Sequence, residues 1–115
     1  ETMCISICER FGLAESMSTI AGGPSEGKEW GKADVIRETM RRLGLTDADK
    51  RRVIMVGNNL SRDVLGANRY GIGSVHFCWS PRYPHEASNP EEEPTYRIHT
   101  MPELLALAER LESTL

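Results

Sequence analysis

The segment Val53–Ile72 constrains the fold most strongly, because it combines an apolar run, a polar turn and a helical pattern. Four apolar residues, three of them β-branched, run from Val53 to Val56 and favour a parallel strand buried on both faces. Gly57 ends this strand, and amide, hydroxyl and carboxylate side chains follow it. Open α/β sheets bind their ligands beyond the carboxyl ends of the strands, so the polar turn is a candidate site.

The same polar turn also has a purely structural interpretation. Ser61 can cap the following helix, and Asp63 can lie in its first turn, where the helix dipole favours a negative charge. Neither role needs a ligand. The residue pattern alone leaves both interpretations, capped turn and binding site, open.

Helical and strand patterns alternate along the chain. Helices are expected over residues 1–11, between Gly31 and Gly44, and over about 62–70. A last helix is expected from the apolar stripe Leu104, Leu107, Ala108, Leu111 and Leu115. Strands are expected over residues 18–21, 53–56, 74–77 and 96–98. Strands separated by helical segments imply a parallel sheet with right-handed crossovers. The predicted fold is α/β, a Rossmann-like three-layer αβα arrangement in one domain over residues 1–115.

Charge and apolar patterning exclude two classes of partner. The 115 residues include 14 basic and 17 acidic side chains, with a formal net charge of -3. These charges are interspersed, whereas nucleic-acid-binding proteins cluster their positive charge. The apolar runs are far shorter than the roughly 20 residues that cross a bilayer. We therefore expect neither a nucleic-acid partner nor a membrane span.

Three cysteines in a chain of this composition favour a reducing cytoplasm over a disulfide-bonded secreted scaffold. Cys4 and Cys8 have the i, i+4 spacing that could present two thiolates to a metal, but Ile7 and Phe11 share their helix face. Both thiols are therefore expected in a buried stripe. Cys78 has no cysteine or histidine at a zinc-like spacing, and all three histidines are expected to be ordinary surface or loop residues.

Two motifs, in order, carry a family resemblance. The polar turn reads Gly57-Asn58-x(4)-Asp63, with Gly66-Ala67 and Tyr70-Gly71-Ile72 after it. This resembles the fourth motif of the haloacid dehalogenase (HAD) superfamily of phosphohydrolases, G-D-x(4)-D before a helix with G-A and a final A-G-I. Upstream, a glycine-rich loop and Gly31-Lys32-Ala33-Asp34-Val35-Ile36 resemble the third motif, particularly in phosphoglycolate-phosphatase-like members. Near the end, Glu93-Pro94-Thr95-Tyr96 is similar to a phrase before the last strand of these proteins.

The resemblance implies that the chain is the C-terminal part of a HAD-like core. Family members begin with a strand that ends in D-x-D-x-[TV], whose first aspartate is the nucleophile, and this motif is absent here. The serine or threonine of the second motif is also missing. We therefore expect motifs III and IV in this chain, motifs I and II upstream of it, and no activity from the 115 residues alone.

The resemblance also implies a magnesium-dependent phosphatase that acts on a small phosphorylated metabolite through an aspartyl-phosphate. Lys32 matches the lysine that stabilises the charge of the nucleophile and the transferring phosphoryl group, and is the predicted catalytic residue. Asn58 and Asp63 are the predicted metal residues. Asp63 matches the second acidic position, which in the family does not bind the metal directly but holds the waters of the metal or the lysine in place. Asn58 departs from the motif, which has aspartate there, although an amide oxygen can still coordinate a hard cation.

Other interpretations of these residues stay open. Lys28 is a rival to Lys32 but lacks the following A-D-V-I context, and a solvated loop lysine is the ordinary alternative for either. Asn58 and the missing motifs are compatible with a catalytically silent HAD-like scaffold. A small-molecule-binding Rossmann module would need a G-x-G-x-x-G turn after a strand, which Gly22, Gly23 and Gly27 do not supply.

Overall fold

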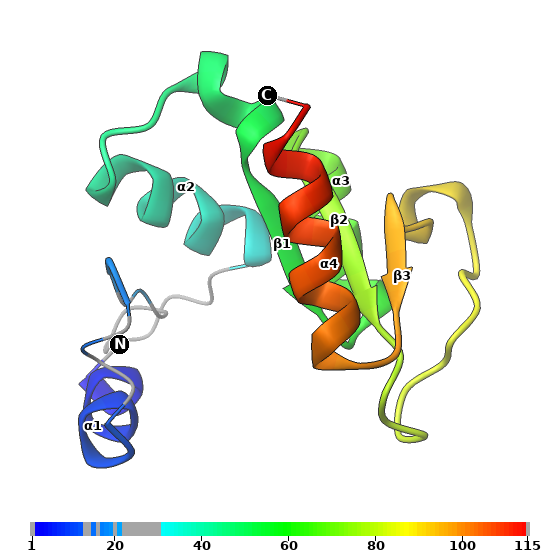
Figure 1. Ribbon diagram of the computed structural model, residues 1–115, viewed down its shortest axis with the longest axis horizontal. Coiled ribbons are helices and arrows are strands. Elements are labelled where there is room, and N and C mark those ends of the chain that lie inside the picture. Colours follow the sequence, from blue (N-terminus) through cyan, green and yellow to red (C-terminus); the bar gives the residue numbers. More distant parts are fainter. Residues whose placement is uncertain (1, 13–14, 16, 20, 22–30, 115) are drawn as a thin grey trace. The chain divides into compact units, whose positions relative to one another are not determined.

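The computed structural model describes residues 2–12, 15, 17–19, 21 and 31–114, and its contacts divide the chain into two compact units, residues 1–48 and 49–115 (Figure 1). The helices and strands are α1 (Thr2–Arg10), α2 (Lys32–Arg42), β1 (Ile54–Gly57), α3 (Leu65–Tyr70), β2 (Gly73–Phe77), β3 (Tyr96–Ile98) and α4 (Met101–Glu112). Short 3-10 helices span Asp47–Arg52 and Pro90–Glu92, and a π-helical turn spans Leu60–Val64. None of the helices in the described part of the chain has the length and apolar character that crossing a membrane requires.

Glycines end both α-helices that the structure describes in the first unit. Gly12 follows α1 with a φ of 70°, and Gly44 follows α2 with a φ of 71°, in the left-handed region that favours glycine. The N–H of Gly44 donates to the carbonyl of Arg41 at 3.1 Å, which satisfies one of the free carbonyls at the helix end. Both helix ends lie where the sequence predicts them. The predicted glycine-rich loop at residues 22–30 lies outside the described residues.

The strand expected over residues 18–21 is wrong for its described residues. Ser18, Thr19 and Ala21 are not in a strand. A short extended segment becomes a strand only where a neighbour takes up its backbone hydrogen bonds. In the described residues the sheet consists of β1, β2 and β3.

The buried stripe expected on α1 is also wrong. Ile7 and Phe11 are exposed, and the free thiol of Cys8 is only half-buried. An apolar helix face is buried only where another element packs on it, and nothing in the described residues covers this one. The side chain of Cys4 lies outside the described residues.

The second unit contains a parallel three-stranded sheet in the order β1-β2-β3. β2 is therefore the central strand, and Val75 pairs with Val56 on one side and with Tyr96 on the other. Val75 and its neighbours Ser74 and His76 are all fully buried. Loss of alternation is the expected consequence for a parallel strand covered on both faces.

Helices cover the two faces of this sheet (Figure 1). On the α4 face, Val75, Ile98 and Leu107 form the core. The partly buried residues packed around it are Ile54, Val56, Phe77, Tyr96, Leu104 and Leu111. On the other face, the Oγ–H of Ser74 donates to Oδ1 of Asn68 in α3 at 2.9 Å. The predicted three-layer α/β arrangement is thereby confirmed.

Asn68 also fixes the connection from β2 to β3. Its Nδ2 donates to the carbonyls of Glu91 and Glu93, at 2.7 and 2.8 Å. Beside it, Arg69 pairs with the Glu91 carboxylate at 2.6 Å. Parallel strands are usually joined through a helix. Here a 3-10 turn held by side-chain hydrogen bonds to α3 replaces that helix.

His76 contradicts the expectation that every histidine is an ordinary surface or loop residue. Its side chain is 0% exposed, between the neighbouring strands and on the face opposite Val75. Nε2 lies 3.3 Å from the carbonyl oxygen of Asn58, and Nδ1 lies 3.1 Å from Sγ of Cys78. A polar group is tolerated at such a position only when it is hydrogen-bonded. His85 and His99 are exposed, as expected.

The neighbours of His76 favour its neutral form. Burial has the largest effect and lowers the pKa of His76 below its usual value, and the charges of Arg97 and His85 act in the same direction. The hydrogen bond to the Asn58 carbonyl and the charge of Asp63 oppose this shift without cancelling it. The folded chain therefore holds a neutral imidazole at a pH where the unfolded chain takes up a proton.

Two leucines of α4 test the core as a matched pair. Leu107 is 5% exposed and Leu105 is 64% exposed. Leu107→Ala should lower the free energy of unfolding by about 2–5 kcal/mol, because it leaves a cavity against Val75 and Ile98. Leu105→Ala should change it by no more than about 0.5 kcal/mol. Urea denaturation followed by circular dichroism measures both, and equal effects would contradict the assigned packing.

Acid should destabilise the chain through His76. The pKa of His76 is lower in the folded chain than in the unfolded chain. Its contribution to the free energy of unfolding is therefore fully present above the unfolded pKa of about 6.5 and is lost as the pH falls below that pKa. The slope for one proton approaches about 1.4 kcal/mol per pH unit. His76→Gln, which stays neutral, should flatten the dependence in urea unfolding curves between about pH 7.5 and 5. Parallel curves for the two proteins would remove His76 as the cause.

Candidate functional site

The candidate site is the loop at the carboxyl end of β1. All three strands are parallel, so their carboxyl ends meet at one edge of the sheet. Asn58 leaves β1 at this edge, and Cys78 and His99 leave β2 and β3 there. Ligands of open α/β sheets bind at such an edge.

Asn59, rather than the expected Ser61, caps the helix after β1. The Asn59 backbone is extended, with a φ of -115° and a ψ of 108°, as an N-cap requires. Its Oδ1 accepts the N–H of Ser61 at 3.1 Å and the Oγ–H of Ser61 at 2.8 Å. The helical path begins at Leu60 instead of residue 62, so Ser61 already lies inside the first turn. Sequence reasoning gave Asn59 no role, although asparagine is a favoured N-cap residue.

Asp63 lies in this turn as a buried carboxylate, with an exposure of 7%. Its Oδ2 accepts the backbone N–H of Asn59 at 3.2 Å. A Cβ added to Gly57 would lie only 2.3 Å from the same oxygen. Any side chain at position 57 would therefore displace the carboxylate, so the glycine of the motif makes room for its aspartate. Sequence reasoning treated Gly57 only as the end of the strand.

Asn58 and Asp63, the two predicted metal residues, lie in the same loop after β1. Asn58 is half-buried, and its backbone carbonyl oxygen lies 3.3 Å from Nε2 of His76. The carboxylate of Asp63 is turned inward, toward Gly57 and the Asn59 amide. The Asp63 carboxylate thus holds the shape of the loop, and contact of Asn58 with a ligand stays a prediction.

The donor atoms of this loop suit a hard cation only in part. An amide oxygen from Asn58 is a ligand type that magnesium accepts. One oxygen of Asp63 is already occupied by the Asn59 N–H, which suits a supporting role. No group of three His, Cys, Asp or Glu side chains that could hold a metal occurs in the described part of the chain. A magnesium ion here would need ligands in addition to Asn58, such as water or substrate oxygens.

Lys32 is the first residue of α2 in the other unit, and it is half-buried. Before it, the N–H of Gly31 donates to Oδ2 of Asp34 at 3.0 Å, which stabilises the helix start. A lysine in the first turn lies at the positive end of the helix dipole, where a positive charge is unfavourable. The approach of Lys32 to the Asn58 loop stays a prediction.

One other acidic pair has the spacing of the missing nucleophile motif. Asp47-Ala48-Asp49 reads D-x-D, but Lys50-Arg51 follows where the motif has x-[TV]. The pair lies in the 3-10 helix that precedes β1, whereas the motif follows a strand. Asp49 also pairs with Arg52 at 2.6 Å. This pair is therefore no candidate nucleophile.

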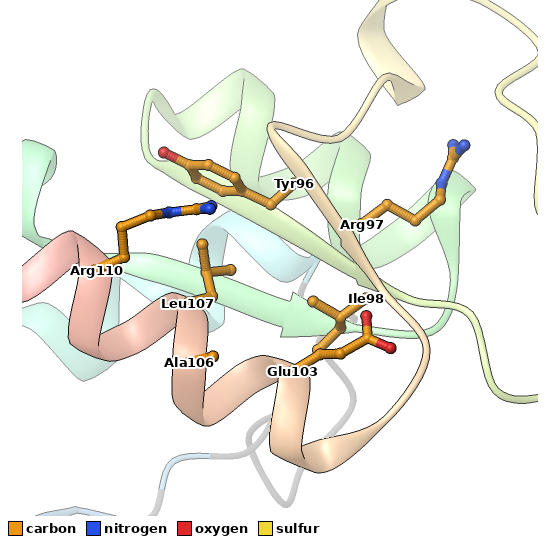
Figure 2. Close-up of a pocket in the computed structure, with 7 residues that line it drawn as sticks. All are labelled: Tyr96, Arg97, Ile98, Glu103, Ala106, Leu107 and Arg110. Carbon is orange, nitrogen blue, oxygen red and sulfur yellow. The ribbon is translucent and has the colours of Figure 1, made fainter.

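A cavity between β3 and α4 is a less suitable candidate (Figure 2). It has a volume of about 270 Å³ and is lined by Tyr96, Arg97, Ile98, Glu103, Ala106, Leu107 and Arg110. Glu103 is occupied in capping α4, since its carboxylate accepts the N–H of His99 at 3.1 Å. The cavity lies along β3, and none of the predicted site residues Lys32, Asn58 and Asp63 lines it. We therefore place the candidate site at the Asn58 loop.

Comparison with known proteins is consistent with this choice. Residues 29–104, more than half of the chain, match a family described as HAD-hydrolase-like. No curated protein matches the chain. The crystal structure of an uncharacterized protein from Listeria monocytogenes serotype 4b is similar, with a TM-score of 0.66 and 21% identity, over 91% of this chain. The chain spans 62% of the length of that protein, and at this identity the likeness concerns the fold alone. The extent of the family match shows that the chain belongs to the HAD-like hydrolases.

Proposed function

We propose that the protein is a magnesium-dependent phosphatase that acts on a small phosphate ester through an aspartyl-phosphate. The observation that carries this proposal is the Gly57–Asp63 loop of a HAD-like hydrolase, located at the carboxyl end of a parallel strand. The D-x-D-x-[TV] motif that supplies the nucleophilic aspartate in this family is not among the 115 residues. The phosphoglycolate-phosphatase-like character of the motifs and a phosphorylated metabolite as substrate are part of the same proposal.

Each motif residue has a separate proposed task. Lys32 provides positive charge to the nucleophile and the phosphoryl group, which would otherwise repel each other. Asn58 offers an amide oxygen to the metal, and Asp63 holds the loop through the Asn59 amide. A bound magnesium ion would supply neutralisation of phosphoryl charge. The free thiols of Cys8 and Cys78 support a reducing, cytoplasmic location.

Asn58 favours a second candidate function. An amide in place of the family's aspartate removes one negative charge from the metal site, and charge count is a main determinant of affinity for a hard cation. A HAD-like scaffold that binds without catalysis would tolerate this loss. We therefore keep a catalytically silent member as the alternative.

Lys32 and Lys28 provide the test of the phosphatase proposal. In the complete encoded protein, assayed with p-nitrophenyl phosphate and magnesium, Lys32→Ala should lower kcat by on the order of 10²-fold, because a preorganised charge is lost. Lys28→Ala, which removes the same charge outside the motif context, should leave kcat unchanged. The 115-residue chain alone should show no turnover. Equal kcat values for the two variants, or turnover by the chain alone, would contradict the proposal.

Asn58 and Asn59 distinguish a metal site from a capped turn. Asn58→Asp adds a negative charge at nearly constant volume, so magnesium affinity of the encoded protein should rise about tenfold, or roughly 1.4 kcal/mol. The direct attraction between the added carboxylate and the ion is larger than this net gain, but dehydration of the ion and of the carboxylate cancels most of it. Asn59→Asp adds the same charge one residue away and keeps a capping side chain, so it should change the affinity less. Calorimetric titration measures both. Equal affinities for both variants and the parent protein would remove Asn58 from the metal site.

A further inference from the structure

The peptide between Asn58 and Asn59 is hydrogen-bonded at both ends by buried side chains. Its N–H, from Asn59, donates to Oδ2 of Asp63 at 3.2 Å. Its carbonyl, from Asn58, lies 3.3 Å from Nε2 of His76. Asp63 comes from the turn after β1, whereas His76 belongs to β2. Two separate elements therefore hold one peptide plane.

The hydrogen bonds of His76 determine which of its nitrogens carries the proton. A carbonyl oxygen only accepts hydrogen bonds, so Nε2 must donate to Asn58. In a ring that carries its proton on Nε2, Nδ1 is an acceptor. Sγ of Cys78 lies 3.1 Å from Nδ1, to which its S–H can donate, and 3.7 Å from the carbonyl oxygen of His76, a second acceptor within its reach. The contact with Cys78 is thus compatible with the tautomer that the Asn58 carbonyl requires.

We propose that His76 is a positioning residue that, together with Asp63, fixes the peptide after Asn58 and thereby directs the Asn58 side chain into the site. The orientation of this peptide sets the ψ angle of Asn58. The backbone N–H of Cys78 donates to the Ile98 carbonyl at 2.8 Å, which anchors the strand end that carries the histidine. The value of this arrangement for metal binding rests on the proposed function.

The proposal predicts a spectroscopic signature in the unmodified chain. Long-range proton–nitrogen correlation spectra should show His76 as a single tautomer with its proton on Nε2. A residue that only fills space in the core has no hydrogen-bond partner that would restrict it to one tautomer. A proton on Nδ1, or a mixture of both tautomers, would overturn the proposal without any variant having to fold.

Two neutral substitutions separate positioning from packing. In His76→Gln the amide nitrogen reaches the place of Nε2 and can still donate to Asn58, whereas in His76→Asn it reaches only the place of Nδ1. Hydrogen exchange of the Asn59 amide should be about tenfold faster in His76→Asn, because the peptide has lost one of its two anchors. It should stay close to the parent rate in His76→Gln. Amides of β3 should exchange alike in both variants, which controls for general destabilisation.

Equal Asn59 exchange in the two variants would overturn the positioning role. These measurements use no metal or phosphate ester, so they stand apart from the phosphatase assay. In the complete encoded protein, His76→Asn should also weaken magnesium binding more than His76→Gln does. An inactive parent protein, with the expected tautomer and exchange, would count against the proposed function and would leave the positioning of the Asn58 peptide supported.

Discussion

The second unit depends on the burial of β2 from both sides. Val75 faces the α4 layer, where apolar contacts with Ile98 and Leu107 remove surface from water. Ser74 and His76 face the opposite side, where each polar atom needs a partner. No buried side-chain nitrogen or oxygen lacks a hydrogen bond in the part of the chain that the structure describes. One strand thus joins an apolar layer to a fully bonded polar layer.

The two layers contribute differently to the structure. The apolar layer provides most of the favourable free energy, since burial is roughly proportional to area and needs no direction. The hydrogen bonds of the polar layer are directional, so they determine how neighbouring segments are positioned. Ser74 and Thr95 illustrate this, because each backbone N–H donates to the hydroxyl oxygen of the other residue, at 3.1 and 3.0 Å. Such reciprocal bonds fix where the segment before β3 meets β2, and Asn68 fixes the turn before it.

The candidate site is a continuation of this polar layer. His76 on β2 contacts the backbone carbonyl of Asn58, and the Asp63 carboxylate packs against Gly57. The loop is therefore ordered by contacts within its own unit, before any ligand is considered. A preorganised loop of this kind is what electrostatic catalysis requires, because its dipoles need not reorient during the reaction. Lys32 belongs to the other unit.

The sequence alone determined the features that depend on local physics. The apolar run at Val53–Val56 indicated a parallel strand, and Gly44 and Gly71 marked helix ends because glycine adopts a positive φ at little cost. The expected burial of this strand on both faces is wrong, since β1 is at the edge of the described sheet and its residues are only half-buried. The spacing of Gly57, Asn58 and Asp63 located the candidate loop and its family. The sequence did not reveal the burial of His76, since a histidine between Val75 and Phe77 fits an exposed position as well as a bonded, buried one. It also did not identify Asn59 as the cap, since Ser61 has the same capping chemistry two residues later.

Tertiary structure decided these points because each depends on a partner distant in sequence or on backbone direction. The Asn58 carbonyl and Cys78 make position 76 acceptable for a buried imidazole. The extended backbone of Asn59 gives that residue, and not Ser61, the capping role. On α1, by contrast, the apolar pattern was present without a covering element, and Ile7 and Phe11 are exposed. A sequence pattern specifies which face can be buried, whereas only packing determines whether a partner exists to bury it.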